Sequence, residues 1–128
     1  MVTKEQVLKA YDQQANFYKL LTHPVRLAIL NVLRDEEACV CHLEAVLGFP
    51  QAYISQQLAV LRGAGLVHDR RENWNIFYHV SDRRIYDMID FTEGMLHPEG
   101  PSILLQRLPD HCTCPKCSRK NGETPPPL

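Results

Sequence analysis

The sequence lacks long apolar runs, and its first residues do not resemble a secretion signal. No stretch approaches the ~18 apolar residues that a membrane-spanning helix requires, and the opening segment MVTKEQVLKAYDQQ has no apolar signal-peptide core. We therefore expect a cytoplasmic protein with no membrane partner. Thiols stay reduced in that compartment, so the five cysteines are not expected to form a disulfide framework.

The motifs of common enzymes are also missing. We find no Gly-rich phosphate loop and no plausible combination of nucleophile, base and acid. Cys114 and Cys117 form a Cys-x-x-Cys pair, but no strand-helix-strand pattern surrounds it as in thioredoxin-like oxidoreductases. The protein is therefore predicted not to be an enzyme.

The chain has no large excess of charge of one sign. Its formal net charge is −1, which argues against a highly basic protein that coats nucleic acid but not against sequence-specific DNA binding by a local basic face. The segment 51–84 is richer in arginine than in acidic residues. On charge alone, a positive face and a solvated surface of mixed sign are equally compatible with that segment.

The apolar residues that are present recur at helical and strand spacings. They predict helices near residues 5–21, 24–33, 38–47, 51–62 and 82–96, and a hairpin of two strands at 66–71 and 76–80. Gly48 ends the third helix, so the third and fourth helices form a helix-turn-helix. The fold class is therefore mainly α with a small β-hairpin: a winged helix-turn-helix of about five helices and a two-stranded wing.

The same pattern predicts the domain organisation and a dimer. Residues 1–97 form the DNA-binding and dimerisation domain, and residues 98–128 form a Cys-containing tail that is partly disordered. A core in a chain of 128 residues is small, so we expect a homodimer through the amphipathic first and last helices. Such a dimer presents two recognition helices about one DNA turn apart.

Four segments together resemble the ArsR/SmtB family of metal-responsive winged-helix repressors, over about residues 20–82. They match the family's second helix, its Cys-Val-Cys metal-binding helix start, its recognition helix with the stretch that follows, and its wing: LTHPVRLAILNVL, ACVCHLEAVLG, QAYISQQLAVLRGAGLV and DRRENWNIFYHV. The resemblance implies a homodimer that binds double-stranded operator DNA and leaves it when a metal ion binds.

Two departures from the family pattern narrow the expected metal site. The last helix reads IYDMIDFTEGMLH and lacks the Asp-x-His and His-x-x-Glu/His pattern of the zinc-type sensors, so no zinc or nickel site is expected there. The first 38 residues contain no Cys, whereas some cadmium- and lead-type members take thiols from an N-terminal extension. Additional thiols must therefore come from the tail.

Cys39 and Cys41 are the first candidate ligands. In an undistorted helix they would point ~200° apart, but both sulfurs can converge where the first turn opens, and a helix N-terminus favours thiolates. Burial of both residues as small hydrophobic side chains is the competing interpretation.

The tail supplies the other candidates, Cys112, Cys114 and Cys117. Soft thiolates favour Zn, Cd, Pb, Cu(I) and trivalent arsenic. We predict that Cys39 and Cys41 join one or two tail thiols to bind a thiophilic effector ion, either As(III) or Sb(III), or Cd(II) or Pb(II). A structural Zn(II) held by the tail alone, or a tail that scavenges metal without a regulatory role, remains an alternative.

The DNA contacts are predicted from the fourth helix and the hairpin. Gln and Ser can bond to base edges, a small apolar side chain can contact a thymine methyl, and arginines can contact phosphate. The candidate residues are Gln51, Ala52, Tyr53, Ser55, Gln56, Arg62, Arg70 and Arg71. Each is alternatively an ordinary solvent-facing polar group. Ile54, Leu58 and Leu61 are expected in the core. Trp74 at the hairpin tip is expected to pack against the wing, and a place in the DNA minor groove is the alternative.

These observations predict a sequence-specific repressor that a thiophilic ion releases from its operator. A thiol redox or persulfide sensor on the same scaffold is the alternative, because Cys39, Cys41 or the tail thiols can form disulfides.

Overall fold

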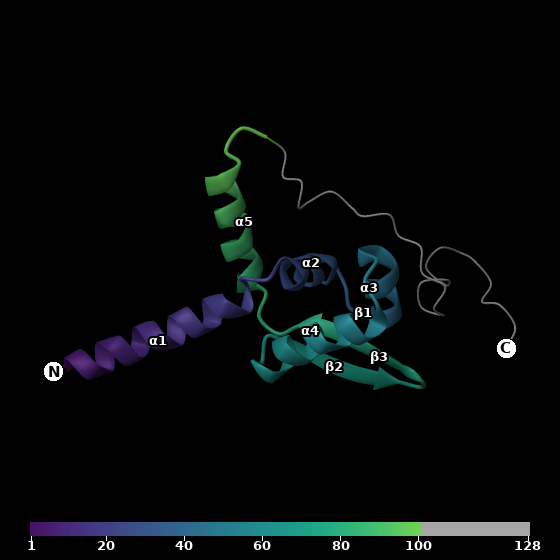
Figure 1. Cartoon of the computed structure of the whole chain (residues 1–128), viewed down its shortest axis with the longest axis horizontal. Helices are drawn as coiled ribbons and strands as arrows, with labels where there is room; N and C mark the ends of the chain where they lie inside the picture. The colour runs from purple at the N-terminus through teal and green to yellow at the C-terminus, as the bar shows by residue number, and fades with distance from the viewer. Residues whose placement is uncertain (101–128) are drawn as a thin grey trace, which may run out of the picture.

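The computed structural model describes residues 1–100; the tail cysteines Cys112, Cys114 and Cys117 lie outside the described residues. The elements follow one another as α1 (Lys4–Leu20), α2 (Pro24–Val32), β1 (Ala38–Cys39), α3 (Val40–Leu47), α4 (Gln51–Gly63), β2 (Val67–Glu72), β3 (Asn75–Val80) and α5 (Arg84–Leu96). Figure 1 shows a central body of α2, α3, α4 and the sheet, from which α1 and α5 project as two arms. The predicted helices and hairpin are confirmed.

The sheet has three strands rather than the predicted two. Short β1 pairs antiparallel with β3, with Ala38 opposite Tyr78 and Cys39 opposite Phe77, so the strand order is β1-β3-β2. The prediction that residues 38 and 39 begin a helix was wrong. A two-residue strand that leads directly into a helix leaves no alternating pattern long enough to distinguish it from the first helical turn.

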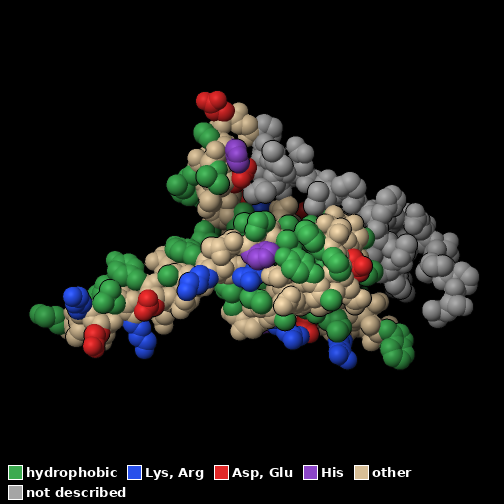
Figure 2. Space-filling view, in the orientation of Figure 1, with side chains coloured by type: hydrophobic (Ala, Val, Ile, Leu, Met, Phe, Trp, Pro, Cys, Tyr) green, Lys and Arg blue, Asp and Glu red, His purple; other side chains and the backbone are tan. Residues whose placement is uncertain are grey.

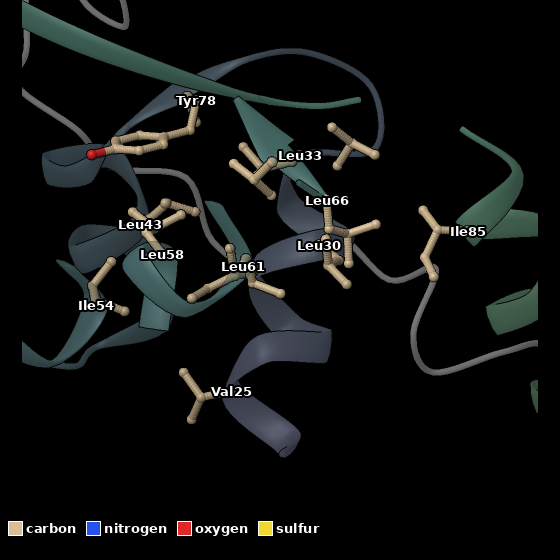
Figure 3. Close-up of a cluster of buried hydrophobic side chains, with 14 of the residues drawn as sticks. Val25, Leu30, Leu33, Leu43, Ile54, Leu58, Leu61, Leu66, Tyr78 and Ile85 are labelled. Carbon is tan, nitrogen blue, oxygen red and sulfur yellow. The ribbon is translucent and has the colours of Figure 1, made fainter. Parts of the chain in front are cut away.

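The core lies between the helix-turn-helix and the sheet. Figure 3 shows side chains from α2, α3, α4 and the strands converging on one cluster. Ile54, Leu58 and Leu61 of α4 are at most 1% exposed, so their predicted place in the core is confirmed. Burial of this cluster holds α4 with its opposite face toward solvent.

The first turn of α5 is anchored to α2 by Tyr86. Its hydroxyl donates a hydrogen bond to the carbonyl of Leu30 at 2.6 Å, and its ring lies under the guanidinium of Arg34. Arg34 in turn donates two hydrogen bonds to the Asp90 carboxylate, at 2.8 and 2.9 Å. Burial raises the pKa of the Tyr86 phenol to about 12. These contacts fix the beginning of α5 on the domain.

The two projecting arms expose much apolar surface. None of the residues of α1 is buried, and Figure 2 shows hydrophobic side chains along both α1 and α5. The exposed large apolar residues of the two helices are Val7, Leu8, Tyr11, Phe17, Tyr18, Phe91, Met95 and Leu96. Within residues 1–100 no helix combines the length and the apolar character needed to cross a bilayer.

Candidate functional site

The helix-turn-helix is built from α3 and α4. Gly48 ends α3 in the left-handed region at φ 76°, a conformation that glycine adopts without steric penalty. Phe49 and Pro50 then lead directly into α4. Along α4 the side chains of Gln51, Ala52 and Gln56 are exposed. An exposed, small and polar helix face of this kind is suited to the major groove.

Tyr53 lies on the same helix but makes contacts inside the protein. Its hydroxyl is 3.2 Å from Nε2 of His23, and its ring is 5.4 Å from that of Phe49. The side chain is half-buried. In this structure Tyr53 therefore joins α4 to the start of α2.

Gln57 is the polar residue of α4 that faces inward. It is 6% exposed, and its Oε1 accepts a hydrogen bond from Nε of Arg26 at 2.8 Å. No buried role was predicted for Gln57 from the sequence. Its position, three residues after Ile54 and one before Leu58, is the signal that would have assigned it to the buried face.

The wing continues from α4 through Gly65 and two buried residues, Leu66 and Val67. Its Arg70 contacts the carboxylates of Glu37 and Glu72, and its guanidinium lies over the ring of Phe77. The hydrogen bond from Arg70 to Glu37, followed by that to Glu72, raises the pKa of Arg70 above its ordinary value. The charge of Arg70 is therefore largely balanced within the protein.

The other two candidate arginines, Arg62 and Arg71, differ in whether a carboxylate of the protein lies close to the guanidinium. Arg62 lies 3.4 Å from the Asp69 carboxylate. Arg71 is exposed, and no carboxylate within residues 1–100 lies in ion-pair distance of it. Figure 2 shows basic side chains along the edge of the molecule that carries α4 and the wing.

The tip of the wing is a two-residue turn, Asn73 and Trp74. Asn73 has φ 57°, which asparagine tolerates better than most residues and which explains how the hairpin closes without glycine. Trp74 is 99% exposed. The expectation that Trp74 packs against the wing was wrong, because so exposed a side chain makes no packing contact with the strands.

The two described cysteines converge at the start of α3. Cys39 is the N-cap residue, with extended backbone at φ −87° and ψ 165°, and the helix begins at the next residue. This break in helical geometry brings the sulfurs of Cys39 and Cys41 to 3.6 Å from each other. Cys39 is buried and Cys41 is exposed. The expected opening of the first turn is thus present, with the chain still extended at Cys39.

The pair is joined through the backbone to the wing and to the first helix of the helix-turn-helix. Cys39 belongs to β1 and pairs with Phe77 of β3, while Cys41 lies in α3. Within residues 1–100 no group of three or more Cys, His, Asp or Glu side chains has the arrangement of a metal site. In this part of the chain Cys39 and Cys41 are therefore two neighbouring thiols without a third such side chain grouped around them.

Comparison with known proteins decides the family. The family model described as "Bacterial regulatory protein, arsR family" matches residues 23–69. The biofilm growth-associated repressor of Xylella fastidiosa strain Temecula1 is 37% identical over 89 residues, covering 70% of this chain and 78% of that protein. The chain belongs to the ArsR family. As an ArsR-family member it is a DNA-binding transcriptional repressor and not an enzyme.

Solved structures agree with the winged helix-turn-helix fold of this ArsR-family chain. The transcriptional repressor BigR from Xylella fastidiosa is 35% identical, with a TM-score of 0.63 over 73% of this chain and 96% of that one. A homodimeric winged helix-turn-helix domain from Mycobacterium bovis, Mb0332, has a TM-score of 0.66 at 24% identity, over 77% of this chain and 95% of that one. At that identity the second comparison supports the fold alone.

The candidate DNA-contacting residues of the ArsR-family domain fall into two groups. Gln51, Ala52, Gln56 and Arg71 are exposed on α4 or the wing, and Ser55 is half-buried. Tyr53, Arg62 and Arg70 contact other residues of the protein. The first group is available for DNA in this conformation, whereas DNA must compete with a partner inside the protein for each residue of the second.

Proposed function

We propose that this repressor binds operator DNA as a homodimer and leaves it when a thiophilic ion binds the thiolates of Cys39 and Cys41 together with one or two tail thiols. The ion is As(III) or Sb(III), or alternatively Cd(II) or Pb(II). The tail candidates are Cys112, Cys114 and Cys117. The observation that carries the proposal is the 3.6 Å separation of the Cys39 and Cys41 sulfurs.

That separation suits two ligands of one ion. For zinc, the reference case, with zinc–sulfur bonds of about 2.3 Å and tetrahedral angles, two thiolates of one site lie about 3.8 Å apart. The sulfurs at 3.6 Å need almost no movement to reach this spacing. Their place at the N-terminus of α3 also favours the thiolate form, which is the form that binds metal.

The position of the pair gives the ion a route to the DNA-reading elements. α3 packs against α4, and Cys39 pairs with β3 of the wing. An ion that draws the two sulfurs toward the tail therefore acts on the recognition helix and on the wing together. An effector releases DNA only if it binds the DNA-incompetent conformation more tightly, and a coupling of about 1–3 kcal/mol weakens DNA affinity about 5–150-fold.

The homodimer is supported by the apolar arms. A helix of 17 residues without one buried side chain is marginally stable alone in water. The exposed apolar residues of α1 and α5 suit a second copy of the chain, because the same two surfaces can pair around a two-fold axis. The homodimeric Mb0332 domain has this fold, although its low identity makes it support for the architecture only.

The test is a titration of a fluorescent operator duplex, followed by anisotropy at one stated salt concentration, since phosphate contacts dominate affinity. As(III), Sb(III), Cd(II), Pb(II) and Zn(II) are compared on the full chain, on Cys39→Ser, on Cys41→Ser and on a chain truncated after Asp110. We expect each Ser variant to bind the operator normally and to lose ion-induced release. Normal release from Cys39→Ser would exclude this pair as the sensor.

Val40→Thr is the matched control, because it adds a hydroxyl between the two cysteines while leaving both sulfurs in place. It is expected to respond to the ion like the natural chain. If the truncated chain still responds, the tail thiols are not needed for ion-induced release. The tail then either holds a separate zinc site or has no regulatory role.

Thiol oxidation is the second candidate function, and the same proximity of sulfurs favours it. Two thiols that form a disulfide lose two protons and two electrons to an oxidant, which diamide supplies in the experiment. Operator release by diamide, reversed by dithiothreitol, together with no response to any ion, would favour this alternative over metal binding.

A further inference from the structure

Trp74 is an exposed aromatic residue that the packing of the domain does not explain. It is the one tryptophan in the chain, and its side chain is 99% exposed at the tip of the β2–β3 hairpin. Its neighbour Asn73 takes the positive φ that the turn requires. The turn thus fixes the backbone and leaves the indole with no role in folding.

The hairpin places this indole at the far end of the DNA-binding surface. β2 follows α4 after only a few residues, and Leu66 and Val67 at its base are buried in the core. A strand of six residues reaches about 20 Å. The minor groove that adjoins a major groove lies about half a helical turn, or ~17 Å, along the duplex. The reach of the wing therefore matches a minor groove next to the one that α4 enters.

One uncompensated cation favours DNA as the partner of this tip, since Glu72 beside the turn is already paired with Arg70. Arg71 precedes the turn, is exposed, and has no carboxylate in ion-pair distance within the described part of the chain. Arginine is attracted by the strong negative potential of a narrow minor groove. Proteins that bind the minor groove read it with arginine and often insert apolar side chains between base steps. This tip presents an exposed arginine three positions from an exposed aromatic ring.

We propose that Trp74 enters the minor groove beside each half-site and selects flanking base steps that lack the exocyclic amino group of guanine. That group projects into the minor groove and is absent from A·T pairs, so it obstructs a bulky ring at the groove floor. This gives the repressor a specificity element in addition to α4. It rests on the DNA binding of the family and is independent of the proposed response to ions.

The experiment uses the full chain, reduced and without added metal, and a duplex enriched by that chain from a randomised 40-base-pair pool. Because Trp74 is the sole tryptophan, its emission reports directly on its surroundings. We expect its emission to be quenched or blue-shifted when the duplex is added. In anisotropy titrations, Trp74→Ala is expected to weaken binding about ten-fold, within the range known for aromatic contacts with bases, while Trp74→Phe keeps most of the affinity.

Inosine substitution distinguishes a Trp74 contact in the minor groove from a contact elsewhere on the DNA. Replacing guanine by inosine in the flank removes the amino group from the minor groove and leaves the major-groove atoms unchanged. The natural chain is expected to bind the inosine flank more tightly, and Trp74→Ala to bind both flanks equally. His79→Ala, an exposed change at the base of the wing, serves as the control and should behave like the natural chain.

Two results would overturn the proposal. Unchanged emission on DNA binding, with natural affinity in Trp74→Ala, would show that the indole does not meet DNA. A loss of affinity in Trp74→Ala that is the same for guanine and inosine flanks would show that the indole does not lie in the minor groove. Because no ion is present, either result leaves the proposed response of Cys39 and Cys41 untouched.

Discussion

Arg26 links the C-terminus of α1 to the recognition helix through Gln57. Its Nε donates to Gln57 Oε1 at 2.8 Å, and its Nη1 lies 3.4 Å from the carbonyl oxygens of both Lys19 and Leu20. One guanidinium thus satisfies carbonyls at the end of the helix proposed to dimerise and also the buried amide of α4. The position of α4 is therefore tied to that of α1.

Gln57→Leu tests this link. The change leaves Nε of Arg26 without its acceptor in a half-buried setting, so we expect a loss of about 1–3 kcal/mol in the free energy of unfolding. Urea denaturation measures it, with Gln56→Leu, an exposed neighbour on the same helix, as the stability control. Equal stability of the two variants would mean that the hydrogen bond contributes nothing net.

Tyr86→Phe tests the anchor of α5. The variant keeps the ring under Arg34 but loses the hydrogen bond to the Leu30 carbonyl. We expect the free energy of unfolding to fall by about 1 kcal/mol, and by more if the buried carbonyl finds no other donor. Tyr78→Phe removes a hydroxyl from another buried tyrosine of the core and is the comparison; a smaller effect is expected there.

The raised pKa of the Tyr86 phenol makes the stability of the protein depend on pH. Burial raises the pKa of Tyr86 to about 12 from an ordinary value of 10.0, so the folded protein holds this proton more tightly than the unfolded chain. The stabilisation is complete below pH 10 and is lost as the pH rises from 10 to 12, by up to about 3 kcal/mol. Other groups titrate in that range, so the measurement is the difference between the natural chain and Tyr86→Phe. A constant difference would contradict the prediction.

The order of the elements was predictable because local chemistry sets it. Pro24 stands at the start of α2 and Gly48 closes α3, as their backbone preferences require. The exposure of Trp74 and the internal contacts of Tyr53 and Arg70 were not predictable. The two contacts depend on partners distant in sequence, namely His23 for Tyr53 and Glu37 for Arg70, and no spacing within a helix or strand identifies such partners.

For the thiol pair, the convergence of Cys39 and Cys41 was predictable from the sequence, whereas their connection to the wing was not. The sequence indicated that Cys39 and Cys41 can converge only if the helix opens, and the break at Cys39 is what the structure has. The pairing of β1 with the wing could not be predicted, because a strand of two residues has no period. That pairing is the feature that connects the cysteines to the hairpin.

Leu8→Glu tests the assembly. Leu8 is 53% exposed on α1, so a carboxylate there does not disturb the core of one copy, but it would be buried against a second copy of the chain. We expect analytical ultracentrifugation to show a shift from dimer to monomer and operator affinity to fall steeply. Lys9→Glu, one position further along the helix, is the charge control; a monomeric natural chain would refute the dimer outright.

DNA phosphates must displace carboxylate partners from Arg70 but not from Arg71. Arg70 is held by Glu37 and Glu72, whereas Arg71 has no ion-pair partner within the described residues. We therefore expect Arg71→Gln to weaken operator binding more than Arg70→Gln, and to lower the slope of log affinity against log salt by about 1 for each phosphate that is no longer neutralised. Anisotropy titrations at several salt concentrations measure both quantities. If Arg70→Gln has the larger effect on the slope, then DNA binding breaks the Glu37 pair, and the conformation of the wing on DNA differs from that of the free protein.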